Sequence, residues 1–158
     1  MKQPPPRLRV VFDCNSLVQA LAFDNSPAAA CLRAAETGQI ELFVSNVTLK
    51  ELRRVCGYER VRAISPAMTP LRIDSFVQRL LFHSTRIRRV TRRFEYPRDP
   101  ADEPYINLAI AAEAHFLVSR DNDLLSLASG FSLPCKQLRR LAPGLKILTP
   151  EQFLASLA

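Results

Sequence analysis

The fold is decided by the stretch from Arg98 to Asp123, which reads RDPADEPYINLAIAAEAHFLVSRDND. Apolar residues dominate positions 106–114 and predict a helix that is buried over most of its surface. Positions 116–118 form a short apolar run, typical of a strand inside a parallel sheet. The start of that helix and the end of that strand belong to one edge of the sheet, where ligands bind. Acids occupy both places: Asp99, Asp102, Glu103, Asp121 and Asp123.

Outward from this stretch, apolar strands and helices alternate along the chain. The other strands are expected at Leu8–Phe12, Glu41–Val44, Ile87–Thr91 and Leu145–Leu148. Helices are expected at 17–23 after a Ser16 cap, at 27–37, 47–55 and 71–83, from Leu124 to near Gly130, and from Pro150. Residues 57–70 show no regular pattern, and residues 131–143 could form a basic helical turn. The alternation predicts an α/β fold: a three-layer α/β/α sandwich with a mainly parallel central sheet.

The length of 158 residues fits one domain, expected at 8–158 behind a flexible proline-rich lead at 1–7. No apolar run approaches the roughly 20 residues of a membrane span, and the N-terminus lacks the apolar core of a signal peptide. The cysteines are widely scattered, which favours reduced, packed thiols over zinc or disulfides. We therefore expect a cytoplasmic protein with no membrane partner.

The chain is basic, with a net charge of +7 and a pI near 9.7. This balance favours a polyanionic partner, although many basic proteins bind none. Several arginines crowd together around Phe94 and Tyr96, where guanidinium groups could grip phosphates and aromatic rings could stack on bases. The alternative is a solvated strand edge and loop. The candidate RNA-binding residues in this segment are Arg88, Arg89, Arg92, Arg93 and Arg98.

The predicted fold gathers carboxylates at one edge of the sheet. Asp13 and Asp121 follow strands, and Glu51 and Asp102 lie near the starts of adjoining helices. Converging carboxylates repel one another unless they are protonated or bind a cation. Magnesium and manganese prefer oxygen ligands, and two such ions about 4 Å apart can assist phosphodiester cleavage. The pattern therefore indicates a metal-dependent nuclease, although acids at helix starts also serve as caps.

Four segments, in order along the chain, carry a family resemblance. They are VVFDCNSLV at Val10–Val18, SNVTLKEL at Ser45–Leu52, RDPADEPYINLAIAAEAHFLVSRDNDLL at Arg98–Leu125 and ILTPEQFLA at Ile147–Ala155. Together they resemble the PIN domain nucleases, in particular bacterial toxin components of toxin-antitoxin systems related to VapC-type toxins. Residues 131–143, the proline-rich lead and the arginine cluster depart from the family pattern. Substrate contacts and oligomer interfaces are therefore left open.

The resemblance implies a catalytic quartet of metal ligands: Asp13, Glu51, Asp102 and Asp121. Asp123 would add a further acid at the same one or two Mg²⁺ or Mn²⁺ ions, and Asn15 and Ser119 would support the site. The implied reaction is endonucleolytic hydrolysis of RNA phosphodiester bonds by a metal-activated water. The same resemblance implies a toxin with a cognate antitoxin as its partner, and a homodimer.

Each proposed ligand has a structural alternative. Asp13 could cap the turn after the first strand, and Asp102 could cap the helix that contains Pro104. Asp123 could cap the helix that begins at Leu124, and Glu51 could be a solvated helix residue.

Two neighbours of these acids have simple expected roles. Asn15 could brace its turn. For Asp99, between Arg98 and Pro100, we expect a loop-shaping or salt-bridging role instead of metal binding.

Three other functions are compatible with parts of this pattern. An aspartyl phosphatase needs a second acid where the chain has Asn15. A phospho-accepting receiver domain could use Lys146, but it lacks paired acids at the first strand and leaves Glu51 unexplained. A PIN-like module that binds RNA or protein without cleaving is the third alternative.

Overall fold

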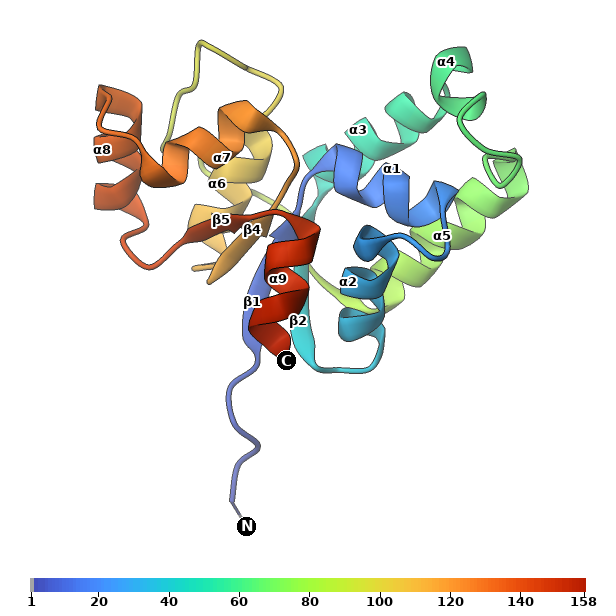
Figure 1. The fold of residues 1–158 in the computed structure, drawn as a ribbon, viewed down its shortest axis with the longest axis horizontal. Helices are drawn as coiled ribbons and strands as arrows, with labels where there is room; N and C mark the ends of the chain where they lie inside the picture. The colour runs from blue at the N-terminus through green and yellow to red at the C-terminus, as the bar shows by residue number, and fades with distance from the viewer. Residues whose placement is uncertain (1) are drawn as a thin grey trace.

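Five parallel strands form the central sheet of the structure, a computed structural model that describes residues 2–158 (Figure 1). In chain order they are β1 (Leu8–Phe12), β2 (Ile40–Ser45), β3 (Ser84–Ile87), β4 (Phe116–Val118) and β5 (Lys146–Leu148). Their order across the sheet is β3-β2-β1-β4-β5. Val10 and Val11 in the central strand are completely buried, because helices cover both faces.

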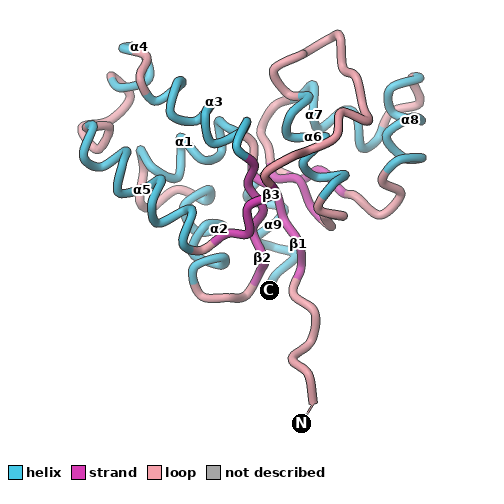
Figure 2. Tube along the Cα trace, turned by 180° about the vertical axis from the view of Figure 1, so that it is seen from behind, coloured by secondary structure: helices cyan, strands magenta, loops and turns pink. Residues whose placement is uncertain are grey.

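The connections between the strands are helical. The helices are α1 (Cys14–Ala22), α2 (Pro27–Glu36), α3 (Asn46–Cys56), α4 (Glu59–Arg62), α5 (Pro70–Phe82), α6 (Glu103–Ala111), α7 (Asn122–Ser129), α8 (Leu133–Leu141) and α9 (Pro150–Leu157). Figures 1 and 2 show α1–α5 and α6–α8 as two groups on either side of the central strands. This arrangement confirms the predicted three-layer α/β/α sandwich.

Crossover handedness explains this division of the helices. The chain runs from β1 outward to β2 and β3, then returns past β1 to β4 and β5. Since parallel crossovers are almost always right-handed, reversing the direction along the sheet moves the connecting helices to the opposite face. Accordingly α6 packs across β1, β2 and β4, while α9 returns to pack on α2.

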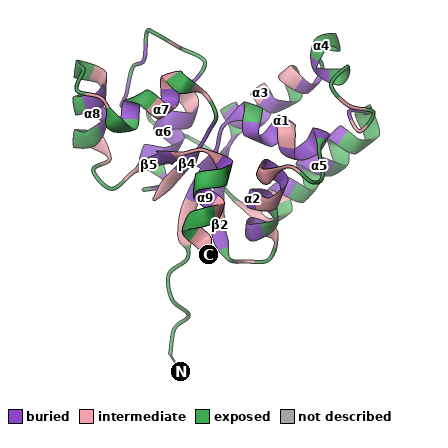
Figure 3. Cartoon of the chain, in the orientation of Figure 1, coloured by how far each residue is buried: buried purple, intermediate pink, exposed green. Residues whose placement is uncertain are grey.

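The core lies between the sheet and these helices (Figure 3). Phe153 of α9 is completely buried and meets Phe12 and Phe116 edge to face, with ring centroids 6.4 and 5.5 Å away. Helix α6 buries most of its surface, as its nearly continuous apolar sequence predicts. The Thr149–Gln152 capping box at the start of α9 is also confirmed.

The element boundaries needed four corrections. Helix α1 begins at Cys14 instead of Leu17, so its cap is Asp13 and not Ser16. Strand β3 covers Ser84–Ile87 instead of 87–91, because pairing with β2 selects a polar edge segment that has little apolar signal. The irregular segment 57–70 contains the short helix α4, and the segment 131–143 contains the helix α8 (Leu133–Leu141) instead of a single turn.

The remaining structural expectations have mixed outcomes. All four cysteines are buried free thiols, as predicted. Residues 2–7 are exposed and outside any helix or strand, whereas Met1 lies outside the described residues. Within residues 2–158, no helix has both the length and the apolar character needed to cross a membrane.

Candidate active site

The candidate site lies where the strand order reverses, between β1 and β4. Connections leave these two strands toward opposite faces of the sheet, and open α/β sheets bind their ligands outside the carboxyl ends of the strands at such a point. Phe12 and Val118 are paired as the last residues of the two strands, and the Asp13 amide donates to the Val118 carbonyl at 3.1 Å. The next residues of both segments, Asp13 and Ser119, are therefore held side by side.

Asp13 is fixed by hydrogen bonds from both segments. Its Oδ1 accepts from the Ser16 amide at 2.9 Å, which caps α1, and its Oδ2 accepts from the Ser119 hydroxyl. The residue is only 3% exposed. Because each carboxylate oxygen has two lone pairs, these bonds orient Asp13 and still leave it able to bind a cation. Its capping role and a ligand role are compatible.

Ser119 connects Asp13 to Asp121. Its hydroxyl donates to Asp13 and accepts from the Asp121 amide at 2.9 Å, and the residue is completely buried. Asp121 caps α7 by accepting from the Asp123 amide at 2.8 Å. The alternative that Asp123 caps this helix is therefore wrong. A single buried hydroxyl sets the relation between the two strand-end aspartates.

Asp102 precedes α6 but does not cap it with its side chain. The residue has helical backbone angles, and its carboxylate accepts no bond from the helix. The whole Asp102 residue is 9% exposed, and its Oδ2 atom is buried without a hydrogen-bond partner within residues 2–158. An unpaired buried polar group costs about 1–3 kcal/mol, and more if it is charged. The simple capping alternative does not account for this atom.

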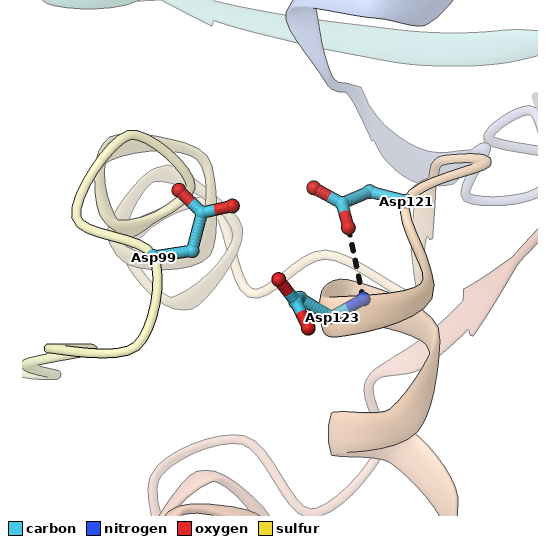
Figure 4. Close-up of side chains that lie close together, drawn as sticks. All are labelled: Asp99, Asp121 and Asp123. Atoms are coloured by element: carbon cyan, nitrogen blue, oxygen red, sulfur yellow. Dashed lines mark hydrogen bonds between the residues drawn. The ribbon is translucent and has the colours of Figure 1, made fainter.

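A tight acidic cluster faces the same space. Asp99, from the loop before α6, lies opposite Asp121 and Asp123 at the start of α7 (Figure 4). One carboxylate oxygen from each residue lies within 4.8 Å of the others. Among the described residues Asp99 forms no ion pair, whereas Arg98 pairs with Asp123 at 3.0 Å. Asp99 therefore belongs to the site, beyond the loop-shaping role expected from sequence.

The electrostatics of the site reflect this crowding. Burial, followed by the facing Asp121 and Asp99 carboxylates, raises the pKa of Asp102 to about 9. Burial also raises the pKa of Asp13, against hydrogen bonds from Ser119 and Ser16 that favour its charged form. Burial therefore disfavours the charged forms of Asp102 and Asp13 unless a positive charge compensates them.

Glu51 borders the site from the second turn of α3. It is half-buried, and burial raises its pKa, while Tyr105 and Arg54 oppose that rise. The charges of Asp13 and Asp99 add to it, so Glu51 lies within electrostatic reach of the other acids. It is not the fully solvated helix residue of the alternative interpretation.

Asn15 differs from the other predicted supporting residue. It is exposed on α1, and its side chain forms no hydrogen bond with any residue from 2 to 158. Ser119 forms hydrogen bonds with Asp13 and with the Asp121 amide, whereas no bracing contact of Asn15 is present within residues 2–158.

The arginine segment is anchored next to these acids by α6. The Asn107 side chain accepts from the amides of Arg93 and Phe94, both at 2.9 Å, and donates to the Phe94 carbonyl at 2.9 Å. Glu103 accepts two bonds from the Arg92 guanidinium and one from the Tyr96 amide. The helix that Asp102 precedes therefore also positions the loop that carries the arginines.

The candidate RNA-binding arginines are not equivalent. Arg92 is paired with Glu103 and Glu95, and Arg98 with Asp123, so both already have acidic partners. Arg88, Arg89 and Arg93 are exposed and form no ion pair within residues 2–158. Among the candidates these three are therefore the free cations. Residues 88–91, predicted as part of a strand, lie in the loop after β3, while residues 92–98 are in the loop that was expected.

The donor set fits a hard divalent cation. The close oxygens of Asp99, Asp121 and Asp123 and the unpaired Asp102 Oδ2 converge from two helix starts. Oxygen donors without sulfur or imidazole suit Mg²⁺ and Mn²⁺. The cluster is compatible with a metal site. In such a site the Asp123 carboxylate would contact both the ion and Arg98.

Sequence reasoning missed two residues here. For Asp99, the signal was its spacing three residues before Asp102 across the turn at Pro100, a pattern equally typical of loops. For Tyr105, the signal was its position three residues after Asp102, on the same helix face. A buried aromatic residue is usually part of the core, so the sequence alone did not indicate a role for the Tyr105 hydroxyl.

Comparison with protein families gives one match. Residues 9–123 match the family model described as PIN domain. The segment Ile147–Ala155, which also carries the resemblance, lies beyond the matched range. A search of proteins with curated functions found no match to this chain.

The raised pKa of Asp102 predicts a pH-dependent stability of the metal-free protein. Between its ordinary value of 3.8 and about 9, the folded state binds more protons than the unfolded state, so stability falls as pH rises. Asp102→Asn cannot ionise and should raise the Tm at pH 8 by a few degrees, with little effect near pH 4. About 1 kcal/mol moves the Tm of such a domain by about 2–4 °C.

Thermal unfolding in excess chelator at both pH values checks this prediction. Asp24→Asn, an exposed acid beyond α1, is the matched control and should leave the pH dependence unchanged. The same pH dependence in Asp102→Asn as in the native chain would contradict the assignment.

Proposed function

The chain belongs to the PIN domain family, whose members are generally nucleases, and we propose from this premise that it is a Mg²⁺- or Mn²⁺-dependent endoribonuclease. One observation carries the metal dependence. The buried Asp102 Oδ2 has no partner within residues 2–158, and it lies beside Asp121 and Asp99 at the reversal point of the sheet. Acids placed there without a counter-charge fit a cation-binding site better than a purely structural cluster.

The residues have distinct roles in this proposal. The proposed metal ligands are Asp13, Glu51, Asp102 and Asp121, with the half-buried Asp99 and Asp123 beside them. Ser119 orients Asp13 and Asp121 through its two hydrogen bonds. The chemistry supplied by a bound divalent ion is activation of a water and stabilisation of the leaving oxygen.

The arginine segment is proposed to hold the RNA backbone. Arg88, Arg89 and Arg93 are exposed, and no acid pairs with them among residues 2–158. Arg98 would exchange Asp123 for a phosphate when an ion occupies the acidic site. Phe94 and Tyr96 are buried, so they support the loop and do not stack on bases.

Cleavage of a mixed panel of structured and single-stranded RNAs tests the nuclease proposal. We expect cleavage with Mn²⁺ or Mg²⁺ that a chelator abolishes. Asp13→Asn and Asp121→Asn should each lower the rate by about 100-fold or more, because metal catalysis supplies several kcal/mol and about 1.4 kcal/mol is tenfold. Asp24→Asn is the matched control and should cleave like the native chain. Cleavage that resists both the chelator and Asp13→Asn would contradict the proposal.

The arginines give a separate prediction about RNA affinity. Arg89→Ala with Arg93→Ala should weaken binding of single-stranded RNA for all sequences. It should also reduce the slope of log K against log salt by about 0.7 for each lost phosphate contact. Binding is measured by fluorescence anisotropy of a labelled RNA in Ca²⁺ without Mg²⁺. Arg72→Ala, an exposed arginine on α5, is the control. An unchanged salt slope in the double variant would contradict this role.

We extend the proposal to a cytoplasmic toxin that forms a homodimer and is neutralised by an antitoxin covering the acidic site. Its support is the resemblance of the four sequence segments, together with buried free thiols that suit a reducing compartment. Induced expression should arrest growth, and Asp13→Asn should abolish the arrest. A chain active on RNA in vitro that leaves growth unaffected would contradict toxicity, and a monomer by light scattering would contradict the dimer.

A further inference from the structure

Tyr105 has a buried hydroxyl without a hydrogen-bond partner. The residue lies in the first turn of α6, and only 2% of it is exposed. Within residues 2–158, the buried side-chain atoms without partners are this hydroxyl and Asp102 Oδ2. The two residues are three positions apart on one helix, so they share a face. Both unpaired atoms therefore belong to the face of α6 that borders the acidic site.

The polar neighbours of this hydroxyl are Glu51 and Cys14. Helix α3, which carries Glu51, packs against α6. Burial, followed by Cys14 and Glu51, raises the pKa of Tyr105, so the phenol stays protonated and acts as a donor. Burial raises the pKa of Cys14 to about 12, so its sulfur stays a neutral thiol and a weak acceptor. The Glu51 carboxylate is the stronger acceptor within reach.

We propose that Tyr105 is a positioning residue, which donates a hydrogen bond to the Glu51 carboxylate and holds it toward the cation site. In this structure neither Glu51 nor Cys14 meets hydrogen-bonding geometry with the hydroxyl, although both lie close enough to raise its pKa. When Glu51 turns toward a cation with one oxygen, its other oxygen becomes available to Tyr105. This inference rests on the proposed metal-binding function.

The proposal predicts different effects of removing the Tyr105 hydroxyl on metal affinity and on thermal stability. Hydrogen bonds to ligating carboxylates usually change metal affinity by about 10- to 100-fold when they are removed. In this structure the hydroxyl has no hydrogen bond to lose, so Tyr105→Phe should not lower the Tm measured in chelator. A structural hydroxyl would instead lower the Tm and leave metal affinity unchanged.

Titration of Mn²⁺ by calorimetry, with the Tm measured in chelator, tests the proposal on the full chain. We expect Tyr105→Phe to raise the Kd for Mn²⁺ about tenfold, with a Tm equal to or above that of the native chain. Tyr58→Phe, in the half-buried link between α3 and α4, is the matched control for Kd. Tyr96→Phe is the control for the Tm measurement. It removes a hydrogen bond from the Tyr96 hydroxyl to the Asp123 carbonyl at 3.0 Å, so it should lower the Tm.

A double variant identifies the partner of the hydroxyl. In a Glu51→Ala background, which removes the acceptor, Tyr105→Phe should have no further effect on the Kd. The same loss in both backgrounds, or a native Kd in Tyr105→Phe alone, would overturn the positioning role and leave the proposed function standing. A native chain that binds no Mn²⁺ would overturn the metal-dependent function, and this inference with it.

Discussion

The site depends on carboxylates that the fold brings together without neutralising them. Asp13, Asp102 and Asp121 immediately precede α1, α6 and α7, and the N-terminus of each helix carries a partial positive charge. The convergence of three helix N-termini makes the cluster tolerable in a folded protein. It does not satisfy Asp102 Oδ2, which stays buried and unpaired within residues 2–158. At Asp13 and Asp121, the capping bonds are compatible with the proposed metal binding.

Helix α6 couples this acidic site to the basic loop beside it. Its first turn supplies Asp102 and Tyr105 to the site, while Glu103 and Asn107 hold the backbone and one arginine of the 92–96 segment. The acidic site and the arginine loop are thus both held by helix α6. In the proposed nuclease, this coupling would place the phosphate-binding arginines at a fixed distance from the reacting phosphodiester.

Sequence reasoning reached the fold and most of the acids because both follow from short-range patterns. Apolar runs ending in Asp13 and near Asp121 located the strand ends, and parallel topology brought them together. The cap of α1 was misplaced because Asp13 and Ser16 are both good capping residues, and only the backbone path decides between them. Strand β3 was misplaced because an edge strand needs little apolar sequence. Asp99 and Tyr105 depend on facing partners from α7 and α3, and no local pattern reports such contacts.

The most direct test of the account is an anomalous difference map from crystals soaked in Mn²⁺. The account predicts a manganese peak bonded to Asp102 Oδ2 and to the Asp121 carboxylate, at the carboxyl ends of β1 and β4. A map with no manganese at these carboxylates, and with Asp102 Oδ2 bonded only to protein groups or water, would contradict it.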